Sequence, residues 1–169
     1  MSITVVPALA GAALDEARIL MREFVAWQRL RFADHLEVID GYFDAVAFDA
    51  ELAGLPGKYA PPTGNLLLAR VDGHSAGVVG LRALDKATCE MKRMFVRPDF
   101  HGRGVGRALA RQLLAEAKAA GYTRMRLDTS TRQIEAQRLY ESLGFRQIAP
   151  YYTPPPGLKD WLVYFERDL

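Results

Sequence analysis

Residues 96–109 read VRPDFHGRGVGRAL, and this stretch decides the fold. A strand ends at Val96, Pro98 stops its extension because proline has no N–H group to donate, and three glycines then lead into a helix. The backbone N–H groups at the start of a helix have no partner within it and carry a partial positive charge. Glycines let a phosphate approach that backbone closely, and Arg103 and Arg107 add full positive charges. The stretch therefore predicts a site for a pyrophosphate.

The same glycines also have a purely structural interpretation. Their spacing, GxGxG over residues 102–106, matches neither the GxxxxGK motif of a P-loop nor the dinucleotide motif GxGxxG. Glycine also serves in tight turns because it adopts positive φ angles at no steric cost. The turn alone leaves both interpretations open, and the sequence around it has to decide between them.

Hydrophobic periodicity on both sides of the turn predicts an α/β fold with a mixed sheet. After the turn we expect helices over 104–120 and 131–143 and strands over 123–129, 145–148 and 161–166. Before it we expect helices over 14–30 and 36–52 and strands over 3–6, 65–71, 75–84 and 87–96. Strands 65–71 and 75–84 flank Asp72-Gly73 and should form an antiparallel hairpin. This order predicts a sheet that is antiparallel early and partly parallel late, with helices on both faces.

Length and composition indicate one soluble domain, which we place at residues 1–169. The single cysteine, Cys89, excludes a disulfide framework and cysteine-based zinc or iron–sulfur sites, and the three histidines are scattered, so we expect no metal. No apolar run reaches the about 20 residues that cross a bilayer. No basic residue precedes Arg18, although a signal peptide needs one near its start. We therefore expect a cytoplasmic protein without a membrane partner.

The charges are unevenly distributed although the net charge is only +2, which is too small to indicate a nucleic-acid partner. Residues 92–111 hold six cations and one carboxylate. Residues 34–51 hold six carboxylates and no cation: Asp34, Glu37, Asp40, Asp44, Asp49 and Glu51. Each run is compatible with a solvated face, and together they also fit a protein that binds an anion at one place and a cation at another.

Two motifs about thirty residues apart resemble those of the GNAT (Gcn5-related N-acetyltransferase) superfamily, and residues 90–98, EMKRMFVRP, resemble a branch of small bacterial members. The family signature Q/R-x-x-G-x-G is present as residues 101–106, with His101 in place of Gln or Arg. A second signature, NxxAxxxYxxxGF, is present as Gln133, Ala136, Tyr140, Gly144 and Phe145, with Gln133 in place of Asn. The close resemblance covers residues 65–145. It implies the GNAT-type acyl-CoA N-acyltransferase fold, a meander followed by βαβαβ with splayed central strands.

The resemblance implies acetyl-CoA as the co-substrate and no metal. It places the acetyl and pantetheine part of acetyl-CoA against the backbone of Met94, Phe95 and Val96. It places the pyrophosphate at the turn, where the expected binding residues are His101, Gly102, Arg103, Gly104, Val105, Gly106 and Arg107. The departures at His101 and Gln133 fall where the backbone matters more than the side chain, so we still expect the cofactor to bind.

Transfer of an acetyl group to an amine needs a base, and Glu90 is the candidate. An amine of pKa ~10.4 is only about one part in two thousand neutral at pH 7, so a carboxylate has to take its proton, directly or through water. Glu90 lies six residues before Val96, a spacing similar to that of catalytic glutamates in the histone-acetylase branch. Four residues of its strand should alternate onto one side: Glu90, Lys92, Met94 and Val96. A structural pair between Glu90 and a neighbouring cation is the alternative.

Tyr140 is the candidate acid. The leaving thiolate has a conjugate acid of pKa about 8.5, and a phenol of pKa about 10 can stabilise or protonate it. The resemblance places this tyrosine near the thioester sulfur, and packing within its helix is the alternative. Cys89 has no activating histidine nearby and is interpreted as a buried free thiol. Asp128 ends a strand beside the cleft and receives no role.

The predicted function is N-acetyltransfer from acetyl-CoA to a primary amine of a small molecule or peptide, by direct attack in a ternary complex. In this fold the first two helices and the last loop build the acceptor site. They carry the acidic run and the aromatic residues Tyr42, Phe43, Tyr151, Tyr152 and Trp161, so we expect a small cationic amine or lysine-like acceptor.

Two alternatives remain open. The first is a regulatory module that senses acetyl-CoA without catalysis. The second is an acetyltransferase of aminoacyl-tRNA, against which the acidic run argues and whose RNA-binding face would be formed by Arg97, Arg103, Arg124, Arg126 and Arg132. Members of the family often pair, so a homodimer is one expected state, although the sequence marks no interface.

Overall fold

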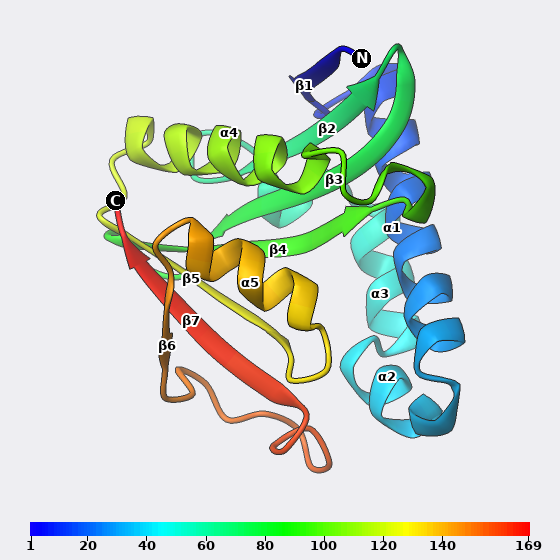
Figure 1. Cartoon of the computed structure of the whole chain (residues 1–169). Helices are drawn as coiled ribbons and strands as arrows, with labels where there is room; N and C mark the ends of the chain where they lie inside the picture. Colours follow the sequence, from blue (N-terminus) through cyan, green and yellow to red (C-terminus); the bar gives the residue numbers. More distant parts are fainter.

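The structure is a computed structural model that describes all 169 residues as a sheet covered by helices on both faces (Figure 1). The strands are β1 (Ile3–Pro7), β2 (Asn65–Val71), β3 (His74–Ala83), β4 (Thr88–Val96), β5 (Arg124–Ser130), β6 (Arg146–Ile148) and β7 (Leu162–Asp168). The helices are α1 (Gly11–Arg31), α2 (Leu36–Tyr42), α3 (Ala45–Ala53), α4 (Val105–Ala119) and α5 (Ile134–Ser142). The strand order is β1-β2-β3-β4-β5-β7-β6, and β4 with β5 is the parallel pair. The predicted mixed α/β class is confirmed.

Two helix predictions need correction. The helix expected over 36–52 is two helices, because the side chain of Asp44 accepts a hydrogen bond from the N–H of Ala47 (2.9 Å) and starts α3 anew. The helix expected from residue 131 begins at Ile134, because the N–H of Thr131 donates to the carbonyl of Trp161 (2.8 Å) and prolongs the β5–β7 ladder. None of the helices has the length and apolar character needed to cross a bilayer.

The sheet separates two hydrophobic cores. Along β2, Leu66 and Leu68 pack with α1, α2 and α3, whereas Leu67 and Ala69 pack with α4 and α5. Successive side chains of a strand point to opposite faces, so both sets are buried only because helices cover both sides. Figure 1 shows this arrangement, with α4 and α5 on one side of the sheet and α1 to α3 on the other. The two layers of helices hold the central strands in place.

The two central strands part soon after they start to pair. The β4–β5 ladder covers only three residue pairs, from Thr88 opposite Arg124 to Glu90 opposite Arg126, although both strands continue. On its other side, β4 carries a bulge: Gly80 pairs with Lys92, but Val78 pairs with Phe95. The separation of β4 and β5 agrees with the splayed strands that the fold class implies.

The bulge corrects one prediction about β4. Arg93 lies within it at a φ of 59°, and the extra residue reverses the alternation of side chains that follows. Lys92 contacts Tyr42 of α2, whereas Met94 and Val96 pack against the core on the α4 side. The expectation that Glu90, Lys92, Met94 and Val96 share one face is therefore wrong.

Gly80 is a position where the fold leaves no room for a side chain. A Cβ atom there would lie 2.7 Å from the ring of Tyr59, which is fully buried. We expect Gly80→Ala to lower the free energy of unfolding by about 1–3 kcal/mol, measured by urea denaturation. Gly41→Ala in α2 is the control, because nothing lies within 4 Å of a Cβ at that exposed helical position. Its stability should hold or rise, and equal losses in both variants would contradict the packing argument.

Candidate active site

A cavity of about 400 Å³ opens where β4 and β5 separate. Its walls come from the ends of both strands, the glycine turn, α5, and parts of α1 and α2. Tyr140 lines it, as do all of the predicted cofactor residues except Arg103: Met94, Phe95, Val96, His101, Gly102, Gly104, Val105, Gly106 and Arg107. The two sequence motifs therefore meet in one cavity.

The glycine turn places the N-terminus of α4 at the cavity wall, and this N-terminus has no side-chain cap. Gly104 precedes α4 at a φ of 85°, and no side chain bonds to the first turn of the helix. The first N–H groups of a helix have no partner within it, so those of Val105, Gly106 and Arg107 remain free to bind a ligand at the cavity wall. Arg107 adds a guanidinium, which donates to Ser142 of α5 (2.9 Å). Free donors and a cation at a helix start fit the pyrophosphate of CoA.

Two predicted cofactor residues have other contacts. The Nε2 atom of His101 forms a hydrogen bond with the backbone carbonyl of Val96 (2.8 Å), so this side chain joins the turn to the end of β4. The guanidinium of Arg103 lies over the ring of Phe100, at 5.6 Å, and is not among the residues that line the cavity.

Gln133, which replaces the usual Asn of the second motif, helps to close the cavity. Its Oε1 atom accepts a hydrogen bond from Nε2 of Gln28 (3.2 Å), and Arg31 pairs with Glu135 beside it. Gln28, Gln133 and Glu135 line the cavity. The end of α1 is thus joined to the start of α5 across the space between them.

Tyr140 faces the cavity from α5 and is nearly fully buried. Its ring packs against Phe145 with centroids 5.9 Å apart, so the packing role considered from the sequence is present as well. Its hydroxyl makes no hydrogen bond within the chain, and burial, with the nearby charge of Asp128, raises the pKa of Tyr140 well above its usual range. Tyr140 is therefore a protonated donor with no internal acceptor.

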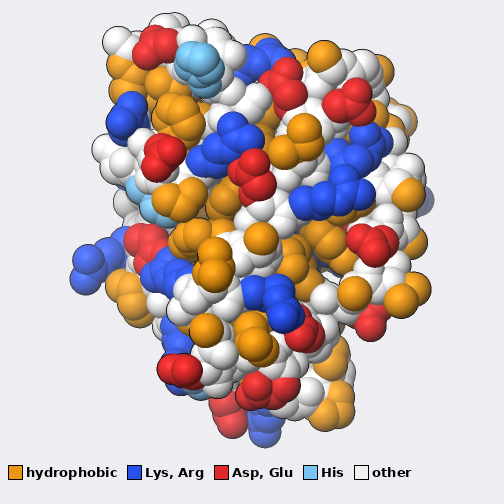
Figure 2. Space-filling view, turned by 90° about the vertical axis from the view of Figure 1, so that its right-hand side faces the viewer, with side chains coloured by type: hydrophobic (Ala, Val, Ile, Leu, Met, Phe, Trp, Pro, Cys, Tyr) orange, Lys and Arg blue, Asp and Glu red, His pale blue; other side chains and the backbone are white.

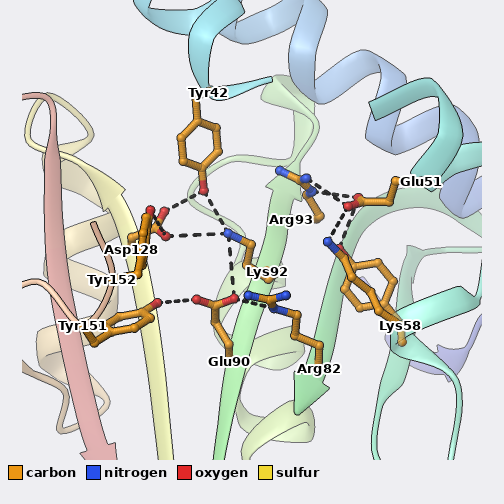
Figure 3. A network of polar contacts seen from close by, with 11 residues as sticks. Tyr42, Glu51, Lys58, Arg82, Glu90, Lys92, Arg93, Asp128, Tyr151 and Tyr152 are labelled. Atoms are coloured by element: carbon orange, nitrogen blue, oxygen red, sulfur yellow. Dashed lines mark hydrogen bonds and ion pairs between the residues drawn. The ribbon is translucent and has the colours of Figure 1, made fainter. Parts of the chain in front are cut away.

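Glu90 is placed differently from the prediction. Its side chain is 1% exposed and is not among the residues that line the cavity. It accepts a hydrogen bond from Arg82 Nε (2.7 Å) and a second one from the hydroxyl of Tyr151 (Figure 3). Glu90 thus forms the structural pair that the sequence left open as the alternative.

Asp128 and Glu135 are the two carboxylates among the residues that line the cavity, and Asp128 receives no role from the sequence alone. It lies on β5 beyond the point where β4 departs, and its side chain is 1% exposed. The hydroxyl of Tyr42 donates to one oxygen (2.6 Å) and that of Tyr152 to the other (2.9 Å). The Nζ atom of Lys92 lies 3.6 Å away (Figure 3). The position of Asp128 near the end of a strand beside the cleft could have marked it as a site residue from the sequence. Its partners Tyr42 and Tyr152 lie too far away in the sequence to be predicted.

The acidic run does not form a wall of the cavity, because none of its six carboxylates is among the lining residues. Glu51 binds Arg93 through two hydrogen bonds (2.9 and 3.0 Å) and pairs with Lys58 at 2.6 Å. Burial alone would raise the pKa of Glu51, but these two partners lower it to about 2. Figure 2 shows the side of the molecule that carries α1 to α3, where acidic and basic side chains are interspersed. The prediction that these six carboxylates attract a cationic acceptor therefore has no support at this cavity.

The arginines considered for an RNA-binding face are mostly occupied. Arg97 binds Glu23 through two hydrogen bonds, and Arg126 binds Glu166. Arg124 lies 3.6 Å from the same Glu166. Each of these three arginines therefore lies beside a carboxylate of the chain, and Arg124 and Arg126 share Glu166.

Comparisons with known proteins agree with this geometry. The sequence profile of the acetyltransferase (GNAT) family matches residues 19–145. An uncharacterized N-acetyltransferase of Schizosaccharomyces pombe is 39% identical over 109 residues, which cover 63% of this chain and 67% of that protein. Human N-acetylaspartate synthetase is 35% identical over 130 residues, which cover 75% of this chain but only 43% of that protein.

A solved structure shares the fold over its whole length. The PaiA N-acetyltransferase of Thermoplasma acidophilum, solved in complex with coenzyme A, superposes with a TM-score of 0.76 at 17% identity and covers 100% of both chains. The fold likeness and the profile match, which extends over most of the chain, point the same way. This chain belongs to the GNAT acetyltransferase family.

Proposed function

We propose that the protein transfers the acetyl group of acetyl-CoA to a primary amine of a small molecule, by direct attack in a ternary complex. One observation carries this proposal: a helix start with free N–H groups and a buried tyrosine hydroxyl open into one cavity, where two parallel strands part. The Thermoplasma neighbour is solved with coenzyme A, which supports CoA as the ligand. The human relative is named for N-acetylaspartate, which supports a small-molecule acceptor.

In this proposal the cofactor is held mainly by backbone. The free N–H groups at the start of α4 and the guanidinium of Arg107 bind the pyrophosphate. The pantetheine arm follows β4 at Met94 to Val96, where no β5 partner occupies the edge of the strand. Unpaired backbone groups of a strand are ready partners for the amides of such an arm.

The reaction forms a bond between the amine nitrogen and the acetyl carbon and breaks the C–S bond. An ammonium group has to lose one proton before it attacks and a second one from the tetrahedral intermediate. We assign the first proton to Asp128, because Asp128 is among the residues that line the cavity and Glu90 is not. Glu90, which the sequence suggested as the base, becomes a positioning residue that holds Arg82 and Tyr151 behind the cavity wall.

The leaving thiolate receives its proton from Tyr140. This hydroxyl has no internal acceptor and stays protonated, because burial raises the pKa of Tyr140. After transfer, the proton released from the intermediate restores the phenol, so the cycle returns Tyr140 to its starting state. The overall products are an N-acetylated amine, CoA and one proton.

A thiol-detecting reagent would follow the release of CoA from the purified protein with a panel of amines. The one cysteine does not compete, because Cys89 is fully buried and burial raises the pKa of its thiol to about 12. Binding of acetyl-CoA without release of CoA by any amine would favour a sensing module. Absence of acetyl-CoA binding would reject the proposal altogether.

Removal of the Tyr140 hydroxyl tests the acid. We expect Tyr140→Phe to lower kcat by about 10²-fold with little change in the KM for acetyl-CoA, because only the proton donor is lost. Tyr122→Phe is the matched control: its hydroxyl donates to Thr63 (2.6 Å), and Tyr122 is not among the residues that line the cavity. Equal kcat values for wild type and Tyr140→Phe would refute the assignment.

Removal of one guanidinium tests the pyrophosphate site. Arg107→Ala should weaken CoA binding by about 10- to 100-fold, as expected for loss of a hydrogen bond between charged groups, measured by titration calorimetry. Arg111→Ala, one helical turn further along α4 and exposed, should bind CoA like the wild type. The difference should vanish with acetyl-pantetheine, which has no pyrophosphate. A persistent difference would place Arg107 elsewhere on the ligand.

The two carboxylates can be compared directly. We expect Asp128→Asn to lower kcat by about 10²-fold or more, and Glu90→Gln to lower it by less than about 10-fold. Asparagine keeps the shape of Asp128 and one acceptor oxygen for the tyrosines, so the loss reports the missing base. A larger effect of Glu90→Gln, with intact CoA affinity, would return the base to Glu90.

A further inference from the structure

We propose that the acceptor is an α-amino acid, bound with its carboxylate at Lys92 and its ammonium group at Asp128. This inference rests on the proposed acetyltransferase function and names the acceptor of the same cavity. It replaces the cationic acceptor expected from the sequence, because the carboxylates of residues 34–51 that supported that expectation do not line the cavity.

Lys92 is the first basis for this inference, because its ammonium group has unused donors inside the cavity wall. An ammonium group has three N–H donors, and the one hydrogen bond that Lys92 makes within the chain is to the hydroxyl of Tyr42 (3.1 Å). Asp128 and Glu90 lie at 3.6 and 3.9 Å, and closer donors already bind both carboxylates. The side chain is 14% exposed and lines the cavity. A ligand carboxylate would give these donors their missing acceptor.

The second basis is the charge of the network around Lys92 (Figure 3). Ion pairs join two cations, Arg82 and Lys92, to two carboxylates, Glu90 and Asp128, so the charges of this group balance. Lys58 and Arg93 belong to a separate group around Glu51. Burying a net charge in such a shielded place is costly, and a zwitterion, whose own charges balance, adds none. A polyamine or lysine side chain would instead add positive charge.

The third basis is the spacing of the two wall charges. In an α-amino acid the ammonium and carboxylate groups are attached to one carbon by bonds of about 1.5 Å, so their charges lie roughly 3 Å apart. Lys92 Nζ and Asp128 Oδ2 lie 3.6 Å apart on the wall. The ligand can therefore align both of its charges with opposite charges of the protein. Its nitrogen then lies at Asp128, the group that takes its proton.

A panel of acceptors of similar size tests this on the wild-type protein. We would compare L-aspartate, L-asparagine, the α-amide of L-aspartate, and cadaverine by kcat/KM from CoA release. Aspartate and asparagine, which both keep the α-carboxylate, should be best. The α-amide should be about 10- to 100-fold worse, because it has no α-carboxylate to pair with Lys92, and cadaverine should be at least as poor.

Variants of Lys92 assign the preference to this residue. Lys92→Met should reduce the aspartate-to-α-amide ratio to less than about threefold, mainly through the KM for aspartate, while the Kd for CoA stays within about twofold. Lys92→Arg keeps the charge and should restore most of the ratio. Lys118→Met removes an exposed lysine from α4 and should leave the ratio unchanged.

The outcomes separate this inference from the proposed function. If cadaverine or a lysine peptide is acetylated better than aspartate, the protein is an acetyltransferase and this inference is wrong. An equal loss for all acceptors in Lys92→Met would also overturn it. If acetyl-CoA does not bind, or no amine releases CoA, the proposed function itself fails. Should Lys92→Met not fold, the wild-type panel still decides.

Discussion

The early separation of β4 from β5 is the constraint on which the rest of this molecule depends. Parallel strands normally continue side by side, but here the ladder ends after Glu90 and Arg126. Each strand keeps its outer neighbour, β3 for β4 and β7 for β5, so the sheet stays intact while the inner backbone edges are left without partners. Buried backbone groups need hydrogen bonds, and a ligand rich in amides can supply them. The two strands that flank this space thus present unpaired backbone N–H and C=O groups to it, as an edge strand does.

Polar side chains inside the cavity wall are held by one another. Arg93 has a left-handed φ that a side chain rarely adopts, but its guanidinium makes two hydrogen bonds to Glu51 and lies over the rings of Phe43 and Phe48. Such networks are stable when every member has a partner and costly when one does not. The partial exception, Lys92, is among the members that line the cavity. The least satisfied group is therefore also within reach of a ligand.

Much of the fold, and the cofactor half of the site, could be predicted from local patterns. The glycine turn, the strand before it and the helix after it lie next to one another in the sequence, so spacing alone places Gly104 at the start of α4 and Tyr140 on α5. The acceptor half could not be predicted, because Asp128 meets Tyr42 and Tyr152 only after the sheet and α2 are assembled. The exchange of roles that we propose between Glu90 and Asp128 has the same origin. A strand pattern shows that a carboxylate is buried, but not whether the cavity or an arginine lies beside it.

The bulge in β4 has a consequence for how this chain can vary. One residue more in β4 than in β3 sends Phe95 toward α1 and sends Met94 and Val96 toward α4. Deleting a single residue between Lys92 and Phe95 would move each following side chain of β4 to the opposite face of the sheet. Both cores would then lose the side chains that fill them. Exchanges of one amino acid for another are local events here, whereas insertions and deletions are not. Across descendants of this gene, the number of residues in this segment should be inherited more strictly than their identity.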